Sequence, residues 1–264
     1  GCVEFNAREV YRGLAKSGIG TAAFPATEES MRLITSLGLR AVPEVTSYCP
    51  YQSVHSDVRA PCLNDPNFVV SEETHLKSMA QIVRDYPTTA ISLGEGNALS
   101  VTGEDLCRCP HCIAGFGDYL RKAHADLAAL NRAWGTAFET WDGILPQTEQ
   151  QARDSKRYAP WIDFRSYMDS VFLNTHTAAR GIVRAADMRA RSGFSTHNAD
   201  ELFTGYDWAA LASHLDMLAT PADPHIVDIV RCSRGPAAFA GIEMPADVTP
   251  EKLRWLPWYA VPTS

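Results

Sequence analysis

Apolar runs of strand length alternate with amphipathic helical segments along this chain, and this alternation restricts its fold more than any other feature. Because a helical segment follows each run before the next one begins, consecutive strands are expected to lie parallel in one sheet. Six such units predict an α/β fold of the (β/α)8 TIM-barrel type, incomplete here because the first and last strands are missing. The expected strands cover 19–24, 39–46, 88–93, 190–195, 215–220 and 238–243.

Helix signals fill the intervals between these runs. Thr27 is expected to cap a helix over 27–38, and Ser71 to cap one that runs to Pro87. Further helices are expected over 7–18, 161–186, 206–214 and 249–260. A doubly wound open sheet is the rival arrangement, but no glycine-rich G-x-G-x-x-G turn follows the first strand, so the barrel is favoured.

The charge balance restricts the partners. The 264 residues carry a formal net charge of -7, and such a surface repels phosphate groups, which argues against a nucleic acid or an anionic membrane as partner. No apolar run reaches the ~20 residues needed to span a bilayer. The opening GCVEFNAREV has neither an initiator methionine nor a signal-peptide pattern, so we expect an internal start in a longer protein.

Two glutamates, Glu95 and Glu243, stand at the ends of expected strands. In a barrel the carboxyl ends of the strands carry the active site, so both side chains are placed to reach a substrate. Retaining glycoside hydrolysis uses such a pair at about 5 Å, one as acid and base and one as nucleophile, and we expect the two carboxyl groups within roughly 4.5–6 Å. The alternative is that each is a solvated loop carboxylate.

Three cysteines stand within six residues in CRCPHC, at positions 107, 109 and 112. Three thiolates do not complete a tetrahedral zinc site, which takes four ligands. Unrelated buried or disulfide-bonded cysteines are the alternative. A zinc-ribbon nucleic-acid module is disfavoured, because the chain is acidic and has no second C-x-x-C.

The stretch 107–138, CRCPHCIAGFGDYLRKAHADLAALNRAWGTAF, together with the preceding Glu95, resembles the catalytic domain of family 42 glycoside hydrolases, the β-galactosidases. The likeness extends over most of the chain. Its further segments are RAPCLNDPNF (59–68), PWIDFRSYMDS (160–170), STHN (195–198) and FAGIEMP (239–245).

This resemblance implies a β-galactosidase-like retaining glycosidase acting on a carbohydrate, with Glu95 as acid/base and Glu243 as nucleophile. It implies a fourth zinc ligand from Cys62, with Cys49 as the nearest alternative. The zinc would be structural, because four cysteine ligands leave no open position for substrate. Residues 1–264 would then form a single glycosidase-like barrel domain with a zinc-binding loop region, whose expected ligands are Cys62, Cys107, Cys109 and Cys112.

The resemblance also implies a homotrimer as the assembly. A cytoplasmic location is favoured by a site of reduced thiolates and by the lack of a signal peptide. A barrel that keeps the fold and the zinc site but only binds carbohydrate, or serves as a scaffold, is the alternative to an enzyme.

One position departs from the family in a way that concerns the substrate. Gly94 stands where the family has an asparagine that contacts the sugar 2-hydroxyl, so restoring it by Gly94→Asn is expected to raise kcat/KM on a galactoside. Trp134 and Trp141 are either sugar platforms or core, with core favoured for Trp134. The residues expected to bind substrate are Arg59, Asn97, His197, Asn198 and Asp223.

Overall fold

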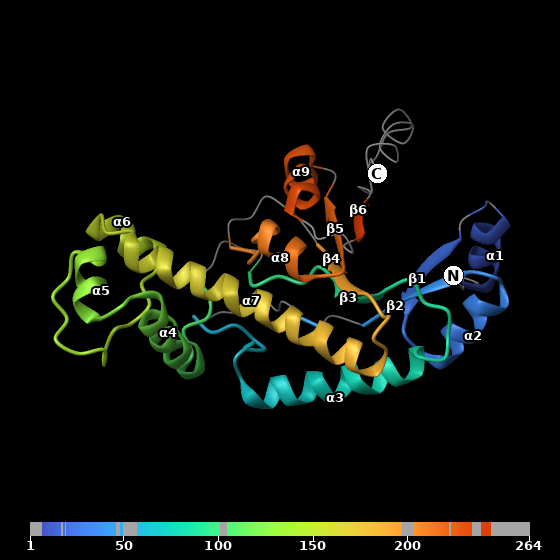
Figure 1. Cartoon of the computed structure of the whole chain (residues 1–264), viewed down its shortest axis with the longest axis horizontal. Coiled ribbons are helices and arrows are strands. Elements are labelled where there is room, and N and C mark those ends of the chain that lie inside the picture. The colour runs from blue at the N-terminus through green and yellow to red at the C-terminus, as the bar shows by residue number, and fades with distance from the viewer. Residues whose placement is uncertain are drawn as a thin grey trace, which may run out of the picture.

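The computed structural model describes residues 7–233 and 239–243, except 17, 19, 46–47, 50–56, 101–104, 197–202 and 222. Its centre is a six-stranded parallel sheet in the order β1-β2-β3-β4-β5-β6 (Figure 1). This sequential order is that of a barrel wall, whereas a doubly wound sheet reverses its order midway. The predicted α/β fold is confirmed as an incomplete TIM-type barrel, with strands β1 (Thr21–Pro25), β2 (Arg40–Glu44), β3 (Ile91–Glu95), β4 (Ser192–Ser195), β5 (Met217–Pro221) and β6 (Phe239–Glu243).

Helices fill the connections between the strands, and α3 and α7 lie side by side along the molecule (Figure 1). The connection from β3 to α7 carries three further helices, gathered at the end of the molecule far from α1 and α2. The connecting helices are α2 (Glu28–Ser36), α3 (Pro66–Val83), α7 (Ala159–Ala186), α8 (Trp208–His214) and α9 (Pro224–Ser233), and the three further ones are α4 (Pro110–Ala123), α5 (Leu127–Trp134) and α6 (Glu149–Ser155). Helix α1 (Ala7–Lys16) precedes β1.

Helix α3 begins earlier than the sequence pattern predicted. Its N-cap is Asp65, whose carboxylate accepts from the Asn67 backbone N–H, and Pro66 occupies the first helical position. The prediction that Ser71 caps this helix was therefore wrong, because a capping aspartate followed by proline is itself a complete start signal. The cap predicted at Thr27 of α2 is present. The helix predicted over 249–260 lies outside the described residues.

The two faces of the sheet differ in burial, as strand β2 demonstrates. Ala41 and Pro43 are buried, and Ala41 belongs to the core that contains Met31 and Ile34 of α2. Val42 and Glu44 alternate with them and are only half-buried. Because successive side chains of a strand point to opposite faces, Glu44 lies on the face turned away from the helices, which in a barrel is the interior.

A buried aspartate ties α7 to the sheet. Asp216 precedes β5, and its carboxylate accepts from Arg180 Nε and Nη2, each at 2.8 Å, and from Arg184 Nη2 at 2.7 Å. The Ser192 backbone N–H at the start of β4 also points to it, at 3.4 Å. The paired two-bond contact with Arg180 fixes direction as well as distance. Asp216 thus links α7 to the starts of β4 and β5.

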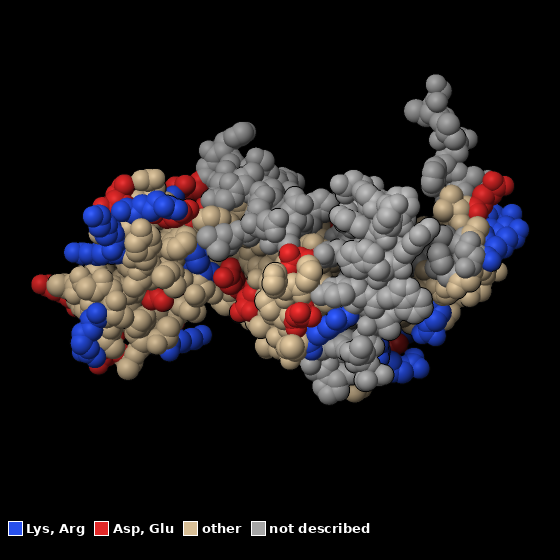
Figure 2. Space-filling model, turned by 90° about the horizontal axis from the view of Figure 1, so that it is seen from above, with Lys and Arg blue, Asp and Glu red and all other residues tan. Residues whose placement is uncertain are grey.

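Charges of both signs are interspersed where α4, α5 and α6 lie (Figure 2). Several of them form pairs along one helix, such as Arg153 with Glu149 and Arg121 with Asp118. Exposed pairs of this kind contribute little to stability. None of the helices in the described part of the chain has the length and apolar character needed to cross a membrane.

Candidate active site and cysteine cluster

Glu95 is the last residue of β3, and its side chain is exposed although the four residues before it are buried. The register against β4 shifts between Ser92 and Glu95, and Gly94 has φ 109°. Such an irregularity at a strand end turns the next side chain away from its regular direction. The backbone therefore presents Glu95 at the carboxyl edge of the sheet, where a barrel binds its substrate.

Glu243 ends β6 at the same edge, paired in register with Pro221 of β5. The order of the strands puts β4 and β5 between it and β3. Its side chain, and the predicted substrate-binding residues His197 and Asn198, lie outside the described residues. The separation of the two carboxyl groups stays a prediction.

Asn97 and Arg59, both predicted to bind substrate, are buried, with exposed fractions of 0% and 1%. The Asn97 amide donates to Leu93 O at 3.0 Å, and its oxygen accepts from the Cys49 backbone N–H at 3.3 Å. Arg59 donates to the carbonyls of Pro61, Cys49, Ala98 and Leu99. Both side chains thus join the loops after β2 and β3 to each other, and these contacts point into the protein.

Asp223 follows β5, and its carboxylate accepts from the backbone N–H groups of His225 and Ile226 at 2.8 and 3.1 Å. These bonds satisfy the free donors at the start of α9. One carboxylate oxygen is therefore engaged in capping. The substrate-binding role predicted for Asp223 would fall to its other carboxylate oxygen.

Glu44 was not among the predicted site residues, yet it ends the neighbouring strand β2, and its carboxylate is close enough to that of Glu95 for the two charges to interact. Its register partner on β3 is Ser92, whose hydroxyl donates to Glu44 Oε1 at 3.4 Å. Burial, and secondarily the carboxylate of Glu95, raise the pKa of Glu44. The sequence does show a glutamate near the carboxyl end of this apolar run. Because the predicted strand extended to residue 46, Glu44 was placed inside the strand and not at its end.

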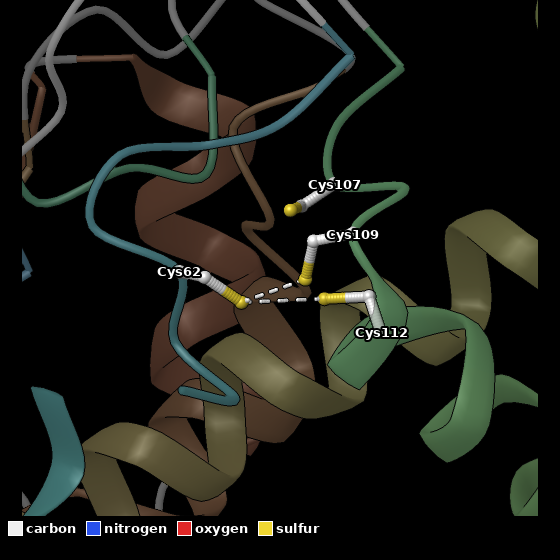
Figure 3. A group of neighbouring side chains, drawn as sticks. All are labelled: Cys62, Cys107, Cys109 and Cys112. Atoms are coloured by element: carbon white, nitrogen blue, oxygen red, sulfur yellow. Dashed lines mark hydrogen bonds between the residues drawn. The ribbon is translucent and has the colours of Figure 1, made fainter. Parts of the chain in front are cut away.

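The four cysteines predicted to bind metal converge, all buried, from two loops (Figure 3). Cys62 comes from the loop after β2, and the other three from the start of α4 and the residues before it. Cys62 Sγ lies 3.3 Å from Cys109 Sγ and 3.6 Å from Cys112 Sγ, and all four sulfurs lie within 4.8 Å of one another. Cys49, the alternative ligand, is instead a hydrogen-bond partner of Arg59 through its sulfur and its carbonyl.

Donors surround these sulfurs. Asn64 points its backbone N–H at Cys62 Sγ (3.4 Å) and its amide at Cys112 Sγ (3.2 Å), and the same amide donates to Tyr167 Oη at 3.0 Å. Hydrogen bonds from the Cys112 and Cys62 thiols lower the pKa of Cys107. A group of four buried sulfurs with N–H donors toward them matches the donor set of a thiolate metal site.

Trp134 lies in the core, 4% exposed, stacked near Phe116 and donating from its indole N–H to Asp163 at 2.7 Å. The core role favoured for it is confirmed. Trp141 is partly exposed, with the Arg121 guanidinium 5.7 Å from its ring centre.

The sequence comparisons with known proteins agree on one group of enzymes. The family model of the glycoside hydrolase family 42 beta-galactosidases matches residues 53–233. The curated beta-galactosidase BgaH of Haloferax lucentense is 25% identical over 229 residues, which are 78% of this chain and 33% of BgaH. The chain thus spans a minor part of the curated relatives it matches.

Solved structures share the fold. The beta-galactosidase of Bacillus circulans sp. alkalophilus superposes with a TM-score of 0.66 at 13% identity, over 95% of this chain and 40% of that one. The catalytic domain of a beta-amylase from Paenibacillus polymyxa gives a TM-score of 0.68 at 14% identity, over 98% of this chain and 88% of that one. Identities this low speak for the fold and not for the substrate.

Proposed function

This chain belongs to glycoside hydrolase family 42, the beta-galactosidases, and from that membership we propose that it is the catalytic barrel of a retaining glycosidase acting on a β-galactoside-like carbohydrate. The observation that carries the proposal is the exposed Glu95 at the carboxyl end of β3, within the segment that the family model matches. A strand-end carboxylate at this edge can reach a glycosidic oxygen, and Glu243 ends β6 at the same edge.

In the first step, a Glu243 oxygen attacks the anomeric carbon as the bond to the glycosidic oxygen breaks, and Glu95 gives its proton to that oxygen. The sugar is then held as an ester on Glu243. In the second step Glu95 takes a proton from water, and the water oxygen attacks the anomeric carbon and releases Glu243. Two inversions leave the anomeric configuration unchanged.

A zinc ion held by Cys62, Cys107, Cys109 and Cys112 is the second part of the proposal. Zinc–sulfur bonds of about 2.3 Å in a tetrahedron set the sulfurs roughly 3.8 Å apart. The separations of 3.3 and 3.6 Å, and the 4.8 Å limit for the whole group, fit that geometry. Because the four thiolates complete the coordination, the ion would clamp the loop after β2 to the loop after β3 and take no part in the reaction.

The proposed partner is a carbohydrate, and the proposed assembly is a homotrimer in the cytoplasm. The full-length protein should hydrolyse a nitrophenyl β-galactoside and release β-galactose first, as observed by proton NMR of the anomeric signal. Glu243→Ala should lose at least about 10⁴-fold in kcat. An exposed acidic residue, Glu28, gives the control variant Glu28→Ala, which should keep wild-type turnover.

A carbohydrate-binding barrel without catalysis predicts the opposite pattern. Wild type and Glu243→Ala would then bind galactosides equally and turn over none of them. Initial release of α-galactose would instead contradict the retaining mechanism.

A further inference from the structure

We propose that Glu44 is a substrate-recognition residue of the glycosidase, whose carboxylate accepts hydrogen bonds from sugar hydroxyl groups beside Glu95. The inference rests on the proposed function, since it adds a specificity contact to that same site. It concerns a residue of β2, one strand away from the acid/base.

The placement of Glu44 is the first support. It is the last residue of β2, at the carboxyl edge of the sheet, and its Cα partner on β3 is Ser92, three residues before Glu95. Burial alternates along β2, so that Glu44 shares its face with Val42 and not with the buried Ala41 and Pro43. Glu44 therefore projects from the face opposite the helices, at the height where a barrel holds its substrate.

The second support is that the Glu44 carboxylate has few hydrogen-bond donors around it in the described part of the chain. The hydroxyl of Ser92 is its hydrogen-bond partner, and at 3.4 Å that contact is long. No lysine, arginine or histidine in the described ranges forms an ion pair with it, although it is half-buried.

A half-buried carboxylate whose one hydrogen bond within the described part of the chain is long is costly to retain for stability alone. Burial and the carboxylate of Glu95 raise the pKa of Glu44, and the hydrogen bond from Ser92 opposes that shift without cancelling it. Sugar hydroxyls are donors that approach from the open side of the sheet. They would supply the missing hydrogen bonds when substrate binds.

The neighbouring positions point to the same need. Gly94 has no side chain for the sugar, and the side chains of Asn97 and Arg59 make their described hydrogen bonds to the protein. Glu44 is the half-exposed polar side chain next to Glu95 on the adjoining strand. It is thus placed to take over a hydroxyl contact that a side chain at position 94 would otherwise make.

The test uses Glu44→Gln and Glu44→Ala in the full-length protein, with nitrophenyl β-galactoside and its 2-, 3-, 4- and 6-deoxy analogues. A hydrogen bond to a charged acceptor predicts a loss of roughly 10- to 100-fold in kcat/KM for Glu44→Ala on the complete sugar. For the deoxy analogue that lacks the contacted hydroxyl, wild type and variant should differ less than about twofold. The analogue on which wild type and Glu44→Ala differ least identifies the sugar hydroxyl that Glu44 contacts.

Glu72→Ala is the matched control, because Glu72 is also a half-buried glutamate but lies on helix α3. It should keep the wild-type preference among the analogues. The same penalty for every deoxy analogue in wild type and Glu44→Ala would overturn the proposal. So would recovery of Glu44→Ala by added divalent cation, since Glu44 would then be a cation ligand.

Binding separates this inference from the proposed reaction. A galactose-configured iminosugar, titrated calorimetrically, should bind Glu44→Gln at least about tenfold more weakly than wild type. If wild type binds the iminosugar but hydrolyses nothing, and Glu44→Gln weakens that binding, the reaction is refuted and the recognition role stands. Equal binding by wild type and both variants refutes the role of Glu44 whether or not the protein is an enzyme.

Discussion

The side-chain amide of Asn97 lies 3.1 Å from Nε2 of His176, and both residues are completely buried. The other ring nitrogen, Nδ1, lies 2.9 Å from Phe172 O. Because a carbonyl can only accept, Nδ1 carries the proton and Nε2 accepts from the amide. The neutral imidazole of His176 on α7 thereby holds the loop after β3 in place through Asn97, which follows Glu95 by two residues.

The first prediction concerns the pH dependence of stability. Burial lowers the pKa of His176 to about 4, below its ordinary 6.5. The unfolded chain therefore binds one more proton than the folded chain between these values, and the free energy of unfolding falls as the pH falls through that window. The loss should reach about 3 kcal/mol at pH 4 as an upper figure, measured by urea unfolding at several pH values.

His176→Gln is the control for this prediction. An amide can keep a contact to Asn97 but does not titrate, so the variant should be less stable at pH 7 and should lose less on acidification. An equal loss in wild type and variant between pH 7 and pH 4 would place the acid sensitivity elsewhere.

The second prediction concerns the attachment of α7. Asp216→Asn removes the charge shared by Arg180 and Arg184 at a nearly buried carboxylate, 3% exposed. Because both arginine side chains remain partly exposed to solvent, the expected loss in the free energy of unfolding is about 2 kcal/mol, below that of a fully buried pair. Asp187→Asn is the matched control, since its partner Arg189 is 88% exposed, and it should leave the free energy of unfolding nearly unchanged. Equal losses in denaturant unfolding would contradict the assigned role of Asp216.

Most of the barrel wall could be predicted, because its largely buried strands appear in the sequence as short apolar runs between amphipathic helical segments. All six predicted strands are present. The helices α4, α5, α6 and α9 were not among the predicted helices; α5 and α6 are short and pack within an insertion rather than on the sheet. The start of α3 was misplaced because the apolar stripe begins later than its capping signal at Asp65 and Pro66.

The site was harder to predict, because sequence position does not say which way a polar side chain points. Asn97 and Arg59 stand in the expected loops, but their described contacts are to other groups of the protein, backbone and side chain. Glu44 was overlooked for a related reason, since the strand ends at this residue and not two residues beyond it. The cysteines were predictable as a group, because three of them stand within six residues and must therefore lie close together in space.

The third prediction concerns the cysteine cluster. The purified full-length protein should contain about one zinc per chain, and Cys109→Ser should lower both the zinc content and the stability. The expected loss is at least about 3 kcal/mol, a fraction of the ~10–16 kcal/mol that structural zinc sites supply. Folded Cys109→Ser protein should keep its kcat, because Glu95 lies outside the cluster. Cys232→Ser, at an exposed cysteine, is the control and should change neither quantity.

A metal assay without zinc in protein prepared under reducing conditions would refute the metal site. Full stability of Cys109→Ser would refute its structural role.

The last prediction concerns Gly94, which has φ 109°. A side chain at this backbone angle is strained by about 1–3 kcal/mol, so Gly94→Asn adds an amide and a strain together. Gly94→Ala adds the strain without the amide and is therefore the reference. If the missing amide limits sugar binding, Gly94→Asn should exceed Gly94→Ala in kcat/KM on a nitrophenyl β-galactoside by roughly tenfold, while both variants unfold at similarly lowered denaturant concentrations. Equal kcat/KM for the two variants would mean that the pocket no longer has room or use for an amide at this position, as expected if Glu44 makes the hydroxyl contact from the neighbouring strand.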